Sequence, residues 1–241
     1  MRVHASTLLL VFLPFLGSGS PRPEAFFLLG LFFVTLLLHE AGHALFARVR
    51  GLEVSEIVLL PIGGYTQARI ETGDWKSELV VVVGGPAVNL ALAALCFLLL
   101  GDARASGGAF DPARFAPGPD LFTREGFLAR AFQANAVLGL LNLCPVWPMD
   151  GGRILRAALV PAAGLARATR ISASVARAVA IGVIAFSTRE PAWMLPASIF
   201  GIFCWRQADR EERRVRFLEA HRRVLATRPP LAERLEPGVP S

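Results

Sequence analysis

The 241-residue chain is poor in charged side chains. Charged residues make up 18% of it and hydrophobic residues 54%, and its mean hydropathy is +0.50. A water-soluble domain of this size needs a more polar surface, so this composition argues against one and favours lipid as the surrounding medium. The sequence therefore predicts an all-α polytopic membrane bundle in place of one or two soluble domains.

Lysine and cysteine are also scarce. Lys76 is the only lysine, although lysine and arginine together number 25 and the formal net charge is +6. Nucleic-acid binding is one meaning of such charge, but the placement of the arginines fits membrane orientation better, and we expect no nucleic-acid partner. The three cysteines have no spacing typical of a disulfide framework or a zinc knuckle, and we expect buried apolar thiols.

Apolar segments recur along the chain, separated by short polar or Gly/Pro-rich stretches. They predict about six membrane-spanning helices, near residues 5–17, 25–47, 78–100, 127–144, 171–188 and 191–205. The first segment also resembles a signal peptide, but no A-x-A-like cleavage site follows it, so we expect a retained helix.

Basic residues gather after the second, fourth and sixth spans and are sparser in the other loops. By the positive-inside rule, both termini are then cytoplasmic in a multi-pass protein of the cell membrane. We expect a membrane domain over 1–205 and a basic cytoplasmic tail over 206–241. The tail begins as a surface helix to about residue 227 and ends disordered.

Residues 52–76 differ from the apolar spans. Their alternating pattern, with β-branched residues around Pro61-Ile62-Gly63-Gly64, predicts two short strands joined by a turn at the membrane edge. The hairpin offers an edge strand to which an unwound polypeptide could add through main-chain hydrogen bonds. Gly63 and Gly64 are therefore candidate substrate-binding residues.

The second span ends in His39-Glu40-Ala41-Gly42-His43, an H-E-x-x-H pattern. On a helix, positions i and i+4 share one face, so both imidazoles can reach one metal ion, with Glu40 close enough to accept a proton from metal-bound water. A polar helix-packing contact is the alternative. Ionisable groups within a span are costly, by about 2.5–3.5 kcal/mol each when charged, which favours the metal site.

Catalytic zinc needs a third protein ligand. The downstream histidine of longer H-E-x-x-H motifs is absent, and Glu53 and Glu56 fall in the hairpin. Asp150 is the better candidate because it closes the fourth span beside Pro145 and Pro148, where irregular backbone at membrane depth indicates a buried or wet site. A helix cap in a cytoplasmic loop is the alternative role for Asp150.

Together these motifs resemble the site-2 proteases, which are intramembrane zinc metalloproteases. HEAGH is followed by N-x-x-P-x-x-P-x-D-G, with Asn142, Pro145, Pro148, Asp150 and Gly151 at the spacing of that family's second motif. GGPAVNL at 84–90 is similar to a third element, and the six-span layout resembles the compact branch typified by the sporulation factor protease. The resemblance covers roughly residues 25–160 and includes no PDZ or CBS domain.

The resemblance implies one Zn²⁺ per chain, held by His39, His43 and Asp150, with Glu40 as the catalytic base. It implies membrane-anchored protein substrates cleaved in or near their transmembrane segments, with the active site toward the cytoplasmic side. Asn142 is expected to orient substrate or to pack between helices. Oligomeric state is unknown. A divalent-cation transporter with an intramembrane His/carboxylate site, or an inactive scaffold, is the alternative function.

Overall fold

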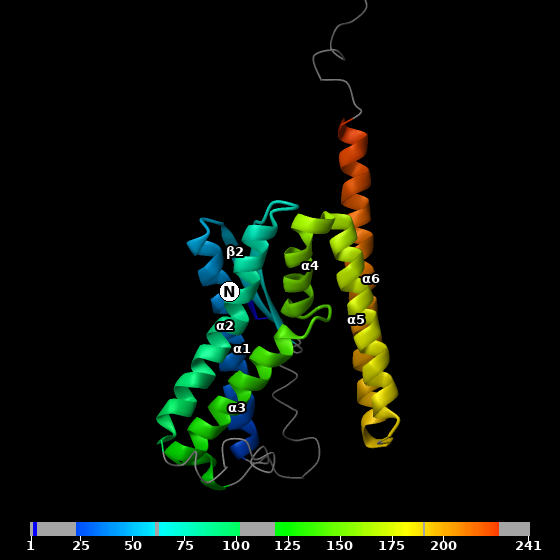
Figure 1. The fold of residues 1–241 in the computed structure, drawn as a ribbon. Coiled ribbons are helices and arrows are strands. Elements are labelled where there is room, and N and C mark those ends of the chain that lie inside the picture. Colours follow the sequence, from blue (N-terminus) through cyan, green and yellow to red (C-terminus); the bar gives the residue numbers. More distant parts are fainter. Residues whose placement is uncertain (1, 4–22, 61–62, 102–118, 190, 227–241) are drawn as a thin grey trace, which may run out of the picture.

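The computed structural model describes residues 2–3, 23–60, 63–101, 119–189 and 191–226. These parts contain six α-helices, one 3₁₀ turn and one small sheet, which confirms the predicted all-α class with a membrane-edge hairpin (Figure 1). The helices are α1 Pro23–Val49, α2 Trp75–Leu99, α3 Arg124–Leu143, α4 Asp150–Ala163, α5 Leu165–Ser187 and α6 Pro191–Ala226. The 3₁₀ turn, η4, covers Pro119–Phe122.

Three of the described helices are long and apolar enough to cross a membrane by themselves: α1, α2 and α5. Large apolar side chains on their surfaces, such as Val34, Leu98 and Phe186, are more than half exposed, as expected when lipid covers them. The predicted spans 127–144 and 191–205 correspond to α3 and to the first half of α6. The predicted span 5–17 lies outside the described residues.

Helices α1 and α2 pack closely because glycine stands at their contact. A Cβ on Gly42 would lie 2.5 Å from the carbonyl oxygen of Gly84, and a Cβ on Gly84 would lie 2.6 Å from that of Gly42. Gly85 allows an equally close approach, since its Cβ would lie 2.5 Å from Nε2 of His43. Small residues that let backbones approach are typical of helix pairs in membranes. This contact brings α2 against the HEAGH turn of α1.

The hairpin comprises β2 Val54–Leu60 and β3 Gly63–Ala68, paired antiparallel with Leu60 opposite Gly63 and Ile57 opposite Thr66. The short strand β1, Arg2–Val3, pairs parallel with the other side of β2. The strand order β1-β2-β3 leaves β3 at one edge of the sheet. That edge strand lies beside the HEAGH turn, where the hydroxyl oxygen of Thr66 lies 3.0 Å from the main-chain oxygen of Glu40.

The segment around Asp150 differs from the expectation. Asp150 does not close the fourth span: α3 ends at Leu143, and Asp150 begins a separate helix, α4, after an irregular stretch. Gly151 makes this turn possible, because a Cβ there would lie 2.1 Å from the carbonyl oxygen of Cys144. The end of α3 therefore folds directly onto the first turn of α4.

Helix α6 continues without a break through residue 205 to Ala226 and extends beyond the other helices (Figure 1). The predicted last span and the predicted basic helix thus form one helix. Its charged half is paired with α5, where Arg177 contacts Asp209 and Glu212. The three cysteines are free thiols, as expected, but only Cys204 is buried; Cys96 is half-buried and Cys144 exposed.

Arg156 of α4 links helix α2 to helix α6. Its guanidinium donates hydrogen bonds to Glu78 of α2 and to Glu211 of α6, and it lies over the ring of Trp147. All three charged side chains are largely buried, so the pairing compensates for charges that would otherwise be costly inside the protein.

Candidate metal centre

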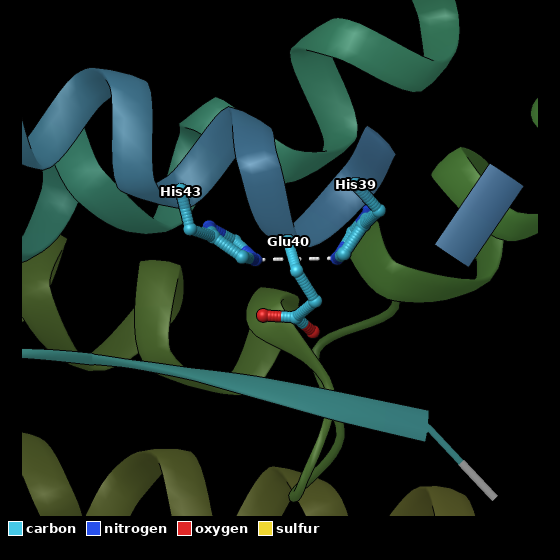
Figure 2. Close-up of side chains that lie close together, drawn as sticks. All are labelled: His39, Glu40 and His43. Atoms are coloured by element: carbon cyan, nitrogen blue, oxygen red, sulfur yellow. Dashed lines mark hydrogen bonds between the residues drawn. The ribbon is translucent and has the colours of Figure 1, made fainter. Parts of the chain in front are cut away.

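Helix α1 brings the two histidines of the motif together, with their rings perpendicular to each other. Nε2 of His39 and Nε2 of His43 are 3.2 Å apart, and both side chains are buried (Figure 2). The spacing of four residues places the imidazoles one above the other on a single helix face. This is the arrangement that the sequence predicts for a shared metal ion.

Asp150 completes a triangle with these nitrogens. Its Oδ2 lies 3.1 Å from Nε2 of His39 and 3.2 Å from Nε2 of His43. The carboxylate stands in the first turn of α4, where the helix dipole favours negative charge. Residues 111 positions apart in the chain therefore converge on one point.

The triangle fits a zinc ion in size and in chemistry. Ligand atoms around tetrahedral zinc, with bonds of about 2.0–2.2 Å, lie about 3.3–3.6 Å apart. The three edges here are 3.1, 3.2 and 3.2 Å. Nδ1 of His39 faces Oδ1 of Asn89, and Nδ1 of His43 faces the carbonyl oxygen of Val81. Both oxygens are acceptors, so each Nδ1 must carry a proton to form a hydrogen bond. A neutral imidazole then has a lone pair on Nε2. Two such lone pairs and a carboxylate oxygen repel one another unless a cation lies between them.

Glu40 lies against the same two histidines but is held separately. Its carboxylate reaches toward β3, below the line joining the two imidazoles in Figure 2. The hydroxyl of Thr66 donates to Oε2 of Glu40 at 2.8 Å. A Cβ on Gly64 would lie 2.8 Å from Oε1 and from Cγ of Glu40. Distance alone would admit Glu40 as a ligand beside His39 and His43. The contact of Asp150 with both imidazoles and the anchoring of Glu40 by β3 favour Asp150 in that role.

A cavity of about 390 Å³ opens onto this cluster. Its walls are mostly apolar, with Phe32 and Leu36 from α1 and Phe200 and Phe203 from α6. An apolar chamber with a few convergent polar groups is the usual form of a site that binds an organic ligand. It has the character needed to receive an apolar polypeptide segment.

The structure brings together five of the seven predicted site residues: His39, Glu40, His43, Asp150 and Gly64. Asn142 lines the cavity, but its amide donates at 3.0 Å to the carbonyl oxygen of Leu138 on its own helix. Gly63 begins β3 and pairs with Leu60 of β2. The alternative ligand Glu53 instead pairs with Arg69 on the exposed surface of the hairpin.

Sequence reasoning missed two polar partners of the cluster, Thr66 and Asn89. Asn89 belongs to the GGPAVNL element, for which no site residue was predicted, yet its side chain is fully buried and its Oδ1 lies 2.6 Å from Nδ1 of His39. Thr66 was one polar residue among several in the hairpin. Its position two residues after Gly64, on the same face of β3, was the available signal.

Comparison with known proteins places the chain in a family. Residues 26–111 and 122–186 match the model of peptidase family M50, and the chain belongs to that family. It is 32% identical over 156 residues to a zinc metalloprotease of Methanocaldococcus jannaschii, covering 65% of this chain and 41% of that protein. It is 30% identical over 122 residues to stage IV sporulation protein FB of Bacillus subtilis, covering 50% of this chain and 36% of that protein. The chain thus spans less than half the length of these curated relatives.

The fold also matches a solved structure, the site-2 protease from Methanocaldococcus jannaschii. The TM-score is 0.61 at 26% identity, and the match covers 87% of this chain and 89% of that one. Family membership and the three apolar helices make the chain a membrane protein.

Proposed function

We propose that the chain is a zinc-dependent intramembrane protease that hydrolyses peptide bonds in or near the transmembrane segments of membrane-anchored proteins. The observation that carries the proposal is the triangle of His39 Nε2, His43 Nε2 and Asp150 Oδ2, with the carboxylate of Glu40 beside it. Zinc held by these three residues supplies Lewis acidity toward a water molecule and a peptide carbonyl. The family membership supports this chemistry.

Glu40 serves as the general base. One of its carboxylate oxygens, Oε2, is occupied by the hydroxyl of Thr66, which leaves Oε1 to accept the proton of the attacking water. The same carboxylic acid then donates that proton to the nitrogen of the leaving amine. Thr66 and Gly64 fix the carboxylate from the β3 side, so the base is positioned before substrate arrives.

The substrate segment adds to the edge of β3. A helix hides its carbonyl groups in internal hydrogen bonds, so a transmembrane substrate must unwind before attack, and an edge strand satisfies the released main-chain groups. Gly64 and Thr66 of β3 line the cavity, which supports placing the extended segment there. Since β2 is the central strand, proline in β2 at Ile57 or Val58 would disturb the whole sheet, and β3 is the sharper target.

Proline in β3 tests this placement. Gln67 and Ala68 are adjacent, so their N–H groups point to opposite sides of the strand. One of the variants Gln67→Pro and Ala68→Pro should remove only an N–H that faces the open edge, and it should lower the cleavage rate with zinc content and melting temperature unchanged. Wild-type cleavage in both variants would rule out strand addition at this edge.

We propose that both termini and the site face the cytoplasm. Arg48 and Arg50 follow the HEAGH turn, Arg153 and Arg156 follow Asp150, and the second half of α6 is rich in arginine. The membrane domain then comprises residues 1–205, and residues 206–241 form a cytoplasmic tail. Reporter fusions after residue 241 and within 102–118 should report opposite sides of the membrane.

The decisive experiment compares wild type with Glu40→Gln in the membrane proteome of the expressing cell. Fragments of membrane-anchored proteins should appear only with wild type, while both purified proteins hold one zinc. Glu53→Gln is the matched control, because Glu53 is a surface glutamate paired only with Arg69 among the contacts described. Identical fragment patterns in wild type and Glu40→Gln would refute protease function. Zinc flux into proteoliposomes without cleavage would instead indicate the transporter alternative.

A further inference from the structure

Both imidazoles of the metal centre contact α2 through Nδ1, the ring nitrogen that does not face Asp150. Nδ1 of His39 lies 2.6 Å from Oδ1 of Asn89, and Nδ1 of His43 lies 2.9 Å from the carbonyl oxygen of Val81. Both partners are oxygen acceptors. Each contact is therefore a hydrogen bond only when Nδ1 carries the proton, which leaves Nε2 as the lone-pair atom facing Asp150.

The main-chain N–H of Gly85 also approaches Nδ1 of His43, at 3.3 Å, and would favour the opposite tautomer. The shorter contact with Val81 decides the matter for His43, because a carbonyl oxygen cannot donate. A carbonyl oxygen in a helix has a fixed direction. The acceptor for His39 differs, since it is a side-chain amide that can turn around.

The orientation of the Asn89 amide is fixed by a second amide. Nδ2 of Asn89 donates to Oδ1 of Asn135 at 2.8 Å, and Nδ2 of Asn135 donates to the carbonyl oxygen of Ala131 at 2.9 Å. Asn89 is fully buried and Asn135 nearly so. If Asn89 were reversed, its NH₂ group would face the Nδ1 proton of His39 and its oxygen would face that of Asn135, so two buried hydrogen bonds would be lost.

We propose that Asn89 and Asn135 form a positioning relay that sets His39 as the Nδ1–H tautomer and aims its Nε2 at the zinc ion. The relay begins at the main chain of α3 and passes through Asn135 of the same helix. It continues through Asn89 of α2 and ends at His39 of α1. It rests on the proposed zinc site but requires no assumption about substrate. Neither asparagine touches the reacting atoms, and both act through the imidazole.

The relay makes zinc affinity depend on two amides that are not ligands. Removing the outer partner of a metal-bound histidine lowers metal affinity by about 10–100-fold, because ring orientation and ligand basicity are lost. Asn89→Leu removes the acceptor and keeps the number and branching of side-chain heavy atoms. Asn89→Asp keeps an acceptor for the Nδ1 proton, although Asn135 can donate to the new carboxylate only by giving up its bond to the carbonyl oxygen of Ala131.

The test measures zinc dissociation constants of the detergent-purified chain by chelator competition, with the melting temperature of the metal-free protein alongside. We expect Asn89→Leu to bind zinc about 10–100-fold more weakly, and Asn89→Asp to bind close to wild type. Asn135→Leu should weaken zinc less than Asn89→Leu, and it carries the test should Asn89→Leu fail to fold. Thr169→Val is the matched control, since this buried hydroxyl on α5 bonds only its own helix among the contacts described.

Two results would overturn the relay. One is wild-type zinc affinity in Asn89→Leu, or in Asn135→Leu if only that variant folds. The other is equal weakening in Asn89→Leu and Asn89→Asp that follows a drop in the melting temperature of the metal-free protein, which indicates packing alone. Visible absorption of the Co²⁺-loaded variants gives an independent readout of ligand geometry. Wild type that binds zinc tightly but cleaves no protein would refute the protease function and leave the relay intact.

Discussion

Replacing Gly64 by alanine tests whether β3 positions the carboxylate of Glu40, the proposed general base. The added Cβ would lie 2.8 Å from Cγ and from Oε1 of Glu40. Ordinary carbon–carbon contact begins at about 3.5 Å, so the side chain must retreat by about 0.7 Å. The methyl group meets the end of a flexible side chain, so stability should change little. A misplacement of about 1 Å at a reacting group costs up to about 100-fold in rate, and we expect Gly64→Ala to lower kcat by 10–100-fold.

The assay follows cleavage of a membrane-anchored substrate, identified by its dependence on Glu40, with the purified protein in detergent. Zinc content and melting temperature should match wild type. Gly182→Ala is the control, because a Cβ at that glycine of α5 meets no atom within 4 Å. A wild-type rate in Gly64→Ala would show that Glu40 does not need its present position. Loss of zinc together with activity would show that the carboxylate supports the metal, contrary to the assigned role.

Three further substitutions address other parts of the site. Gly85→Ala places a Cβ 2.5 Å from Nε2 of His43, so we expect zinc bound at least about tenfold more weakly while the helical circular dichroism is retained. Thr66→Val removes the hydrogen bond to Glu40 and should lower kcat by about tenfold or more with zinc content unchanged, as measured in the same cleavage assay. Arg156→Met removes the nearest cation of two buried glutamates and leaves them only the longer contacts with Arg153 and Arg214. It should destabilise the protein by up to about 3–5 kcal/mol in denaturant unfolding; a loss below 1 kcal/mol would contradict the pairing.

The zinc-facing pair could be predicted from sequence because helical periodicity is local. Four residues separate His39 and His43, and any regular helix places them on one face. Both histidines lie within an apolar span, where ionisable side chains are costly in free energy, and this cost favoured a functional role for them. Asp150 could be singled out as a candidate but not placed. Its position depends on Gly151 fitting beneath the carbonyl oxygen of Cys144, which is a contact of the folded chain.

Asn89 shows where sequence reasoning stops. The sequence shows its motif, with two glycines and a proline, and in the structure Gly84 of that motif allows close helix packing. The hydrogen bond to His39 joins residues 50 positions apart, and no spacing rule relates them. The end of the last span was predicted from charge at Arg206. Arginine and glutamate are good helix formers, however, and pairing with α5 lets one helix continue to Ala226.

Asp150, the proposed third ligand, and the charged junction lie on the same short helix. Asp150 stands in the first turn of α4, and Arg156 lies less than two turns further on, held between Glu78 of α2 and Glu211 of α6. His39 and His43 are fixed by α1 and α2, whereas the distance from Asp150 to both histidines depends on the position of α4. The ion pairs of Arg156 tie α4 to α2, and so to the helix that orients both imidazoles. The pairing at the charged end of the bundle therefore contributes to the geometry of the metal triangle as well as to stability.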